Sequence, residues 1–134
     1  MKKVLTTCGY CGCGCSFYVN VRDDEVIGVT PEAGHPVSQG KLCVKGWQGY
    51  TFVNHPDRLK QPLKRQRDGS FKEMAWEEAI ESTAEELNRI IFEYGPEAIG
   101  VLSSARCTNE ENYLMVKFAR SVLRTSNIDH CARL

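Results

Sequence analysis

The run Cys8-Gly9-Tyr10-Cys11-Gly12-Cys13-Gly14-Cys15, followed much later by Cys43, decides how the first part of this chain folds. A [4Fe-4S] cubane needs four thiolates that converge on its corners, and three from one tight loop plus one from a distant segment meet that need. The intervening glycines relax the backbone where several ligands must point at one centre, and they expose amides that can donate to cluster sulfur. The pattern therefore predicts an iron–sulfur cluster in a small N-terminal unit.

Two alternatives remain open at this point. Four cysteines also form a tetrahedral zinc site, although zinc ribbons usually contribute two Cys-x2-Cys pairs and here the distal element is the single Cys43. The spacing favours iron–sulfur over zinc on that ground. It does not choose the third ligand of the first loop, because Cys13 and Cys15 fit about equally well.

The composition excludes several classes of function. The 134 residues contain 17 basic and 17 acidic side chains, so the overall charge gives no case for a nucleic-acid or anionic-membrane partner. No apolar run follows the first lysines and none approaches membrane length, which predicts a cytoplasmic location. Seven cysteines in a reducing compartment indicate metal or redox chemistry, and an odd count fits a disulfide framework poorly.

The first 57 residues are expected to form a β subdomain. Apolar side chains alternate in residues 16–22, a turn follows, and residues 26–30 return as a second strand. A loop rich in glycine and proline then leads to Cys43. Residues 58–74 are interpreted as a linker whose basic run, 58–67, is solvated; a zinc module that contacts nucleic acid through this run is the competing hypothesis.

Residues 75–134 predict the start of an α/β, Rossmann-like domain. Apolar positions recur at helical spacing from Trp76 to Tyr94, Gly95 ends the helix, and residues 98–102 form a short buried strand. Thr108 and Glu111 have capping-box spacing and open a second helix. Its expected inner face consists of apolar residues: Leu114, Met115, Phe118, Ala119 and Val122. Helix, buried strand and helix are typical of a parallel-sheet domain, here incomplete, which a small self-contained electron carrier would not need.

The motifs together resemble the molybdopterin oxidoreductases, and most of all the formate dehydrogenases. The resemblance covers the whole chain. It rests on the cysteine loop, on Gly40-Lys41-Leu42-Cys43-Val44-Lys45-Gly46, on Arg58-Leu59-x2-Pro62-Leu63, on Trp76-Glu77-Glu78-Ala79, on Ser103-Ser104-Ala105-Arg106, on Asn109-Glu110-Glu111-Asn112-Tyr113, and on residues 127–134.

The resemblance implies a set of site residues. The cluster ligands would be Cys8, Cys11, Cys15 and Cys43, with Cys13 a bystander. Lys45 matches a lysine that lies between cluster and pterin and passes electrons. The loop after the predicted strand, at the carboxyl end where α/β sheets place ligands, would face the pterin; its candidates are Ser104, Arg106 and Asn109, and Cys107 is expected to be an unligated thiol.

The resemblance also implies a function. The expected activity is oxidation of formate to carbon dioxide, or the reverse, at a molybdenum or tungsten bis(molybdopterin guanine dinucleotide). The [4Fe-4S] cluster would exchange electrons with further iron–sulfur subunits, and the 134-residue chain alone is expected to be inactive. Within the family the alternatives are a nitrate reductase or another related oxidoreductase subunit.

The final stretch, residues 127–134, resembles the segment just ahead of the formate dehydrogenase active site. In that family the metal-ligating selenocysteine or cysteine follows at once, so the resemblance predicts selenocysteine at position 135 and a chain truncated at its codon. Cys131 has His130 beside it, but neighbours on a strand point to opposite sides. Cys131 is therefore expected to be a buried structural cysteine.

Overall fold

The computed structural model describes residues 1–131 as two compact units, which are treated separately below. The first unit contains residues 1–58 and 103–114 and the residues from His130 on. The second contains residues 59–102 and 115–129. None of the helices in residues 1–131 is long and apolar enough to cross a membrane.

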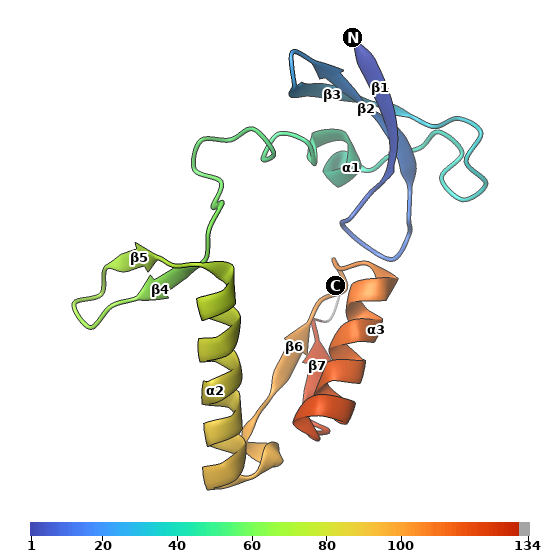
Figure 1. The fold of residues 1–134 in the computed structure, drawn as a ribbon. Helices are drawn as coiled ribbons and strands as arrows, with labels where there is room; N and C mark the ends of the chain where they lie inside the picture. Colours follow the sequence, from blue (N-terminus) through green and yellow to red (C-terminus); the bar gives the residue numbers. More distant parts are fainter. Residues whose placement is uncertain (132–134) are drawn as a thin grey trace. The chain divides into compact units, whose positions relative to one another are not determined.

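An antiparallel three-stranded sheet forms the framework of the first unit (Figure 1). Its strands are β1 (Lys2–Thr7), β2 (Ser16–Arg22) and β3 (Glu25–Pro31), in that order across the sheet. Asp23 and Asp24 join β2 to β3, and both have positive φ, 51° and 62°, as a tight type I′ hairpin turn requires. The predicted strands at 16–22 and 26–30 are thus confirmed, whereas β1 was not predicted.

A loop with its own hydrogen bonds connects the sheet to helix α1 (Val44–Gln48). The N–H of Gly40 donates to the carbonyl of Glu32 over 3.1 Å, and the N–H of Ser38 donates to Nδ1 of His35 over 3.1 Å. Gly40 has a φ of 73° and lies close to the backbone of Ala33, so a side chain there would be strained and crowded. The loop therefore delivers Cys43 to the start of α1 in a defined conformation.

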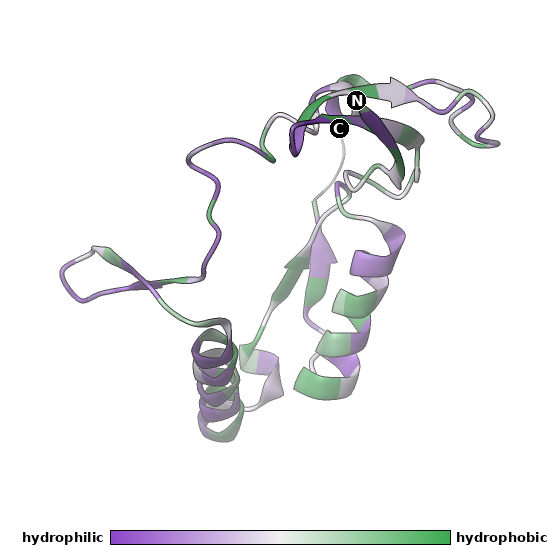
Figure 2. Ribbon diagram, turned by 45° about the horizontal axis from the view of Figure 1, so that its top comes forward, coloured by the Kyte–Doolittle hydropathy of each residue, from purple (hydrophilic) through white to green (hydrophobic). Residues whose placement is uncertain are grey.

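The segment expected to be an unstructured linker contains a short hairpin. Strands β4 (Leu63–Arg65) and β5 (Phe71–Glu73) pair in antiparallel register around a turn that includes Asp68 and Gly69. Asp68 accepts from both the N–H and the hydroxyl of Ser70, at 2.9 and 2.7 Å. The hairpin and the chain before it are largely hydrophilic (Figure 2) and exposed, in keeping with the predicted solvated run.

The second unit is built around two helical segments and a pair of strands. Helix α2 (Trp76–Tyr94) has the predicted bounds and ends at Gly95, whose φ is 83°. The 3-10 helix η1 (Pro96–Ala98) follows, so the strand β6 (Val101–Ser103) starts later than the sequence predicts. Three elements follow: α3 (Asn109–Lys117), of which residues 109–114 belong to the first unit, the π-helical η2 (Phe118–Leu123), and β7 (Ile128–His130), which pairs with β6.

The core of the second unit consists of Ile99, Val101, Ala119 and Leu123. Partly buried residues of α2, α3 and β7 pack against it: Leu87, Ile90, Ile91, Met115 and Ile128. Of the predicted inner face of the second helix, Leu114, Phe118 and Val122 are exposed instead, whereas Ala119 is buried and Met115 is partly buried. The helix changes from α- to π-helical geometry after Lys117, which alters the spacing of the inward positions beyond that residue, so that Ala119 and Leu123 face inward.

Candidate metal centre

The cysteine loop, residues 8–15, is the connection between β1 and β2. Its two ends are joined, because the N–H of Cys8 donates to the carbonyl of Cys15 over 2.8 Å and Thr7 pairs with Ser16. Cys8 is buried, Cys11 and Cys15 are half-buried, and Cys13 is exposed. The hairpin thus holds the first and last cysteines of the loop side by side, and Cys13 lies at its exposed part.

The thiols of this loop influence one another. Burial, followed by the neighbouring thiols of Cys13, Cys8 and Cys11, raises the pKa of Cys15. Thiolates crowded in this way repel each other unless a cation lies among them. The loop is therefore a group of soft donors that a positively charged iron centre would stabilise.

The three glycines of the loop differ in whether the structure would accept a side chain at their positions. Gly14 has a φ of 61°, a left-handed conformation that disfavours side chains. Gly12 has ordinary φ, but a Cβ there would lie 3.0 Å from Cγ of Asn109 and closer still to its Oδ1. Gly9 has neither constraint, since nothing lies within 4 Å of a Cβ at that position. The predicted relaxing role therefore applies to Gly14, and Gly12 is needed for a close approach.

Cys43 lies at the N-cap of α1 in extended conformation (φ −77°, ψ 172°). The backbone N–H groups of Gly46 and Lys45, together with the Lys45 ammonium, lower the pKa of the Cys43 thiol. Its carbonyl accepts from the N–H of Trp47 over 3.1 Å. The start of the helix thus favours the thiolate, the form in which cysteine binds metal.

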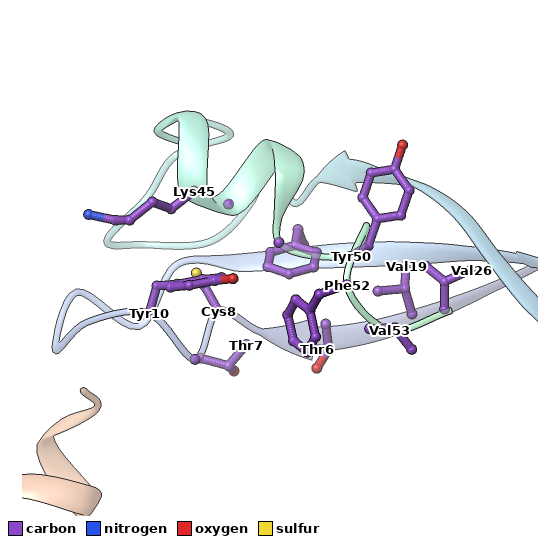
Figure 3. Close-up of a pocket in the computed structure, with 14 residues that line it drawn as sticks. Thr6, Thr7, Cys8, Tyr10, Val19, Val26, Lys45, Tyr50, Phe52 and Val53 are labelled. Carbon is purple, nitrogen blue, oxygen red and sulfur yellow. The ribbon is translucent and has the colours of Figure 1, made fainter. Parts of the chain in front are cut away.

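A pocket of about 420 Å³ separates the cysteine loop from α1 (Figure 3). Cys8, Tyr10 and Lys45 lie at one end of it and valines from the sheet at the other. The ring of Tyr10 lies against Gly49, so that a Cβ on Gly49 would approach Tyr10 Cε2 to 2.7 Å. This contact brings the Cys43 helix to the loop of the other cysteines, and Lys45 is half-buried beside Cys8.

The candidate ligands lie on two segments of the first unit. In residues 1–131, no group of three or more His, Cys, Asp or Glu side chains is placed to hold one metal ion. A cubane takes one thiolate at each of four corners. Two segments linked by the Tyr10–Gly49 contact provide enough thiols, and the amide groups near Cys43 add the hydrogen-bond donors that such centres use.

The loop of residues 103–108 is held by Asn112, which the sequence analysis did not single out. Its Nδ2 donates to the carbonyls of Ser104 and Thr108, at 3.2 and 3.1 Å, and its Oδ1 accepts from the Ser103 hydroxyl over 2.5 Å. Asn112 lies one helical turn after Thr108, and this spacing could have indicated the contact from the sequence. Arg106 is exposed, and its N–H donates to the hydroxyl of Ser104 over 3.1 Å.

The predicted capping box at the start of α3 is confirmed. The N–H of Thr108 donates to Oε2 of Glu111 over 2.7 Å, and the N–H of Glu111 donates back to the Thr108 hydroxyl over 3.2 Å. Asn109 follows directly and is exposed. Its Nδ2 donates to the carbonyl of Gly12 over 3.2 Å, so this pterin candidate contacts the cysteine loop.

The expectation for Cys131 was wrong. Cys131 is exposed. Its sulfur accepts from the N–H of Ala105 over 3.4 Å and lies 3.6 Å from the Ser104 hydroxyl. Ser104 and Ala105, followed by His130 and Arg106, lower the pKa of the Cys131 thiol. The polar turn after β6, and not an apolar core, surrounds this cysteine.

Comparison with known families agrees with this geometry. A model described as the molybdopterin oxidoreductase Fe4S4 domain matches residues 1–55, and one described as molybdopterin oxidoreductase matches residues 58–134. The chain belongs to the molybdopterin oxidoreductases. The predicted fold class, the [4Fe-4S] cluster and the molybdopterin cofactor are thereby confirmed for this family member.

Three relatives of this molybdopterin oxidoreductase are named as formate dehydrogenases or as their alpha subunits. It is 48% identical to F420-dependent formate dehydrogenase 1 subunit alpha of Methanococcus maripaludis, over 98% of this chain and 19% of the relative. It is 50% identical to the F420-dependent formate dehydrogenase subunit alpha of Methanocaldococcus jannaschii, over 99% of this chain and 19% of the relative. A putative formate dehydrogenase of Bacillus subtilis is 42% identical, over 98% of this chain and 13% of the relative. The chain thus spans less than a fifth of the length of these relatives.

A solved structure shares the fold of this molybdopterin oxidoreductase. Acetylene hydratase from Pelobacter acetylenicus superposes with a TM-score of 0.72 at 27% identity, over 96% of this chain and 18% of the hydratase chain. The three cofactor candidates Ser104, Arg106 and Asn109 all come from the 58–134 match. The four candidate cluster ligands come from the 1–55 match.

Proposed function

We propose that the chain is the N-terminal, cluster-bearing part of a formate dehydrogenase that uses a molybdenum or tungsten bis(molybdopterin guanine dinucleotide). The observation that carries the proposal is the 42–50% identity to three proteins named as formate dehydrogenases or their alpha subunits, along nearly the whole chain. The similarity to acetylene hydratase is lower, 27%, and one fold can serve several reactions. The higher sequence identity therefore supports formate oxidation over the hydratase reaction.

The proposed cluster ligands are Cys8, Cys11, Cys15 and Cys43. The joined ends of the cysteine loop support Cys8 and Cys15, and the lowered pKa of Cys43 supports a thiolate at the fourth position. Cys13 is proposed as a bystander because the family resemblance assigns the third ligand to Cys15. When bound, a [4Fe-4S] cluster supplies one-electron transfer between the formate-oxidising centre and an acceptor.

Lys45 is proposed to assist electron transfer. It is half-buried at the same end of the pocket as Cys8, and its ammonium lowers the pKa of Cys43. A cation beside thiolate ligands stabilises the additional negative charge of a reduced cluster. Ser104, Arg106 and Asn109 are proposed as groups that face the pterin, with Ser104 and the loop around it held in place by Asn112.

The finer parts of the proposal concern the surroundings of the protein. Its partners would be formate or carbon dioxide and the iron–sulfur subunits that take the electrons, in the cytoplasm. Residues 132–134 lie outside the described residues, and the resemblance of 127–134 supports a metal-ligating selenocysteine at position 135. The codon after that for Leu134 tests this point: TGA followed by a histidine codon supports selenocysteine, and a cysteine codon rejects it.

The proposed activity is tested on the full-length protein that the gene encodes, by adding formate under anaerobic conditions and following reduction of the cluster. Formate should produce the electron paramagnetic resonance signal of a reduced [4Fe-4S] cluster and should reduce an added viologen dye. Nitrate and acetylene serve as competing substrates. If dithionite reduces the cluster but formate does not, the protein has a cluster and is not a formate dehydrogenase.

A further inference from the structure

The contact between Asn109 and Gly12 joins residues 97 positions apart within the first unit. The side-chain amide donates to the Gly12 carbonyl, and the same side chain occupies the space that a Cβ on Gly12 would need. Gly12 lies between Cys11, a proposed ligand, and Cys13. A hydrogen bond and close packing thus act together at the middle of the cysteine loop.

Asn109 is held in place from its own side. It is the first residue of α3, directly after the Thr108–Glu111 capping box. The carbonyl of Thr108 also accepts from Asn112. The backbone that carries Asn109 is therefore fixed by two neighbouring side chains, which limits how far its amide can move.

The geometry of the peptide bond gives this contact a chemical consequence. In a trans peptide the C=O of Gly12 and the N–H of Cys13 point in opposite directions. By holding the carbonyl, Asn109 fixes the orientation of the whole Gly12–Cys13 peptide group and turns the Cys13 N–H away from α3. Amide donors near cluster sulfur stabilise the reduced state, so the orientation of such peptides contributes to the reduction potential.

We propose that Asn109 is a positioning residue for the iron–sulfur cluster: it holds the Gly12–Cys13 peptide in the orientation that the cluster loop needs. The proposal rests on ligation of a cluster by the cysteine loop, and it does not depend on formate as the substrate. It assigns Asn109 to the cluster loop, beyond the pterin role that the resemblance implies.

Four variants test it in the protein as its gene encodes it. Gly12→Ala places a Cβ against the Asn109 side chain, and Gly9→Ala is the matched control in the same loop, with nothing within 4 Å of its Cβ. Asn109→Ala removes both the donor and the steric contact. The double variant Gly12→Ala/Asn109→Ala adds the Cβ at position 12 and removes the Asn109 amide group that this Cβ would contact.

The measurements are iron and sulfide per chain and the midpoint potential in a dithionite titration followed by electron paramagnetic resonance. Gly12→Ala should lose most of its cluster, Gly9→Ala should retain it, and the double variant should regain at least half of the lost iron. Asn109→Ala should keep a cluster with a lower midpoint potential, because the Cys13 N–H is no longer oriented. Asn109→Leu, which keeps about the same size, loses the donor and adds no charge, should show the same direction of shift.

Three results would overturn the inference. They are equal cluster content in Gly12→Ala and Gly9→Ala, no recovery in the double variant, and an unchanged midpoint potential in Asn109→Ala and Asn109→Leu. A purely structural role for Asn109 would alter stability but leave the potential where it was. Because dithionite supplies the electrons, these outcomes are separate from the test of formate oxidation.

Discussion

The ring of Tyr10 lies against the backbone of Gly49, where a Cβ would come within 2.7 Å of Cε2 of the ring. Tyr10 belongs to the loop of Cys8, Cys11 and Cys15, whereas Gly49 caps the helix that begins after Cys43. An aromatic ring on a glycine therefore joins the loop that carries Cys8, Cys11 and Cys15 to the helix that follows Cys43. Convergence of two segments on one metal group depends on this type of contact as much as on the ligands.

The first prediction follows from that contact. Gly49→Ala should force the ring of Tyr10 to move and should lower cluster content measured as iron and sulfide per chain. Tyr10→Phe should retain the cluster, because the contact uses ring carbons. The control is Gly100→Ala, where nothing lies within 4 Å of the new Cβ. Equal iron content in Gly49→Ala and Gly100→Ala would show that the contact is dispensable.

The second prediction concerns ligation. Serine at position 8, 11, 15 or 43 should remove most of the iron and sulfide, because serine replaces a soft thiolate poorly at an iron–sulfur centre. Cys13→Ser should remain near the wild-type content, because the proposed third ligand is Cys15. Retention in Cys15→Ser together with loss in Cys13→Ser would assign the third ligand to Cys13.

The third prediction concerns Lys45. Lys45→Ala should slow turnover with external acceptors while formate still reduces the active-site metal, because the altered step is electron transfer beyond that metal. Lys45→Arg keeps the positive charge and should retain more of the rate. Stopped-flow reduction by formate, compared with steady-state turnover, separates the two steps. Equal steady-state rates in wild type and Lys45→Ala would reduce Lys45 to a loop residue.

Local patterns predicted much of this fold. The alternation in β2, the helical spacing of α2 and the Thr108–Glu111 capping box each act over a few residues, and the structure contains all three. Strand β1 was missed because Lys2, Lys3, Thr6 and Thr7 weaken its apolar signal, and it forms by pairing with β2. The three-residue strands of the β4–β5 hairpin are too short for a periodic pattern to indicate them.

The candidate site was predictable to the extent that its chemistry is local. The four cysteines of residues 8–15 and Cys43 were visible in the sequence, as was Lys45, two residues after Cys43. The contacts of Tyr10 with Gly49 and of Asn109 with Gly12 join distant segments, and no spacing rule indicates them. Cys131 was misjudged because its surroundings, the polar turn at Ser104 and Ala105, are formed by residues 26 and 27 positions earlier.

The fourth prediction concerns the stability of the second unit. The buried hydroxyl of Thr125 donates to the carbonyl of Ile99 over 3.0 Å and accepts from the N–H of Asn127 over 3.1 Å. Thr125→Val keeps the shape and leaves both partners unsatisfied, which should cost about 1–3 kcal/mol in the free energy of unfolding. Thr125→Ser retains the hydroxyl and should cost less. Chemical denaturation of wild type and both variants measures the difference. Equal unfolding midpoints in wild type and Thr125→Val would contradict the role of this hydroxyl.

The last prediction uses the lowered pKa of Cys131. An ordinary thiol has a pKa of about 8.5, so at a pH below that value a larger fraction of Cys131 than of an ordinary cysteine is thiolate. Alkylation of Cys131 by iodoacetamide, followed residue by residue with mass spectrometry, should therefore show a lower rate midpoint than the cysteine of an unstructured peptide measured in parallel. The Ser104 hydroxyl contributes most to this lowering because it donates to the thiolate, and Ser104→Ala should move the midpoint upward. Ser126→Ala is the matched control, because the exposed Ser126 belongs to the second unit. A midpoint at the ordinary value, or one that Ser104→Ala does not move, would show that the polar turn after β6 does not stabilise the Cys131 thiolate.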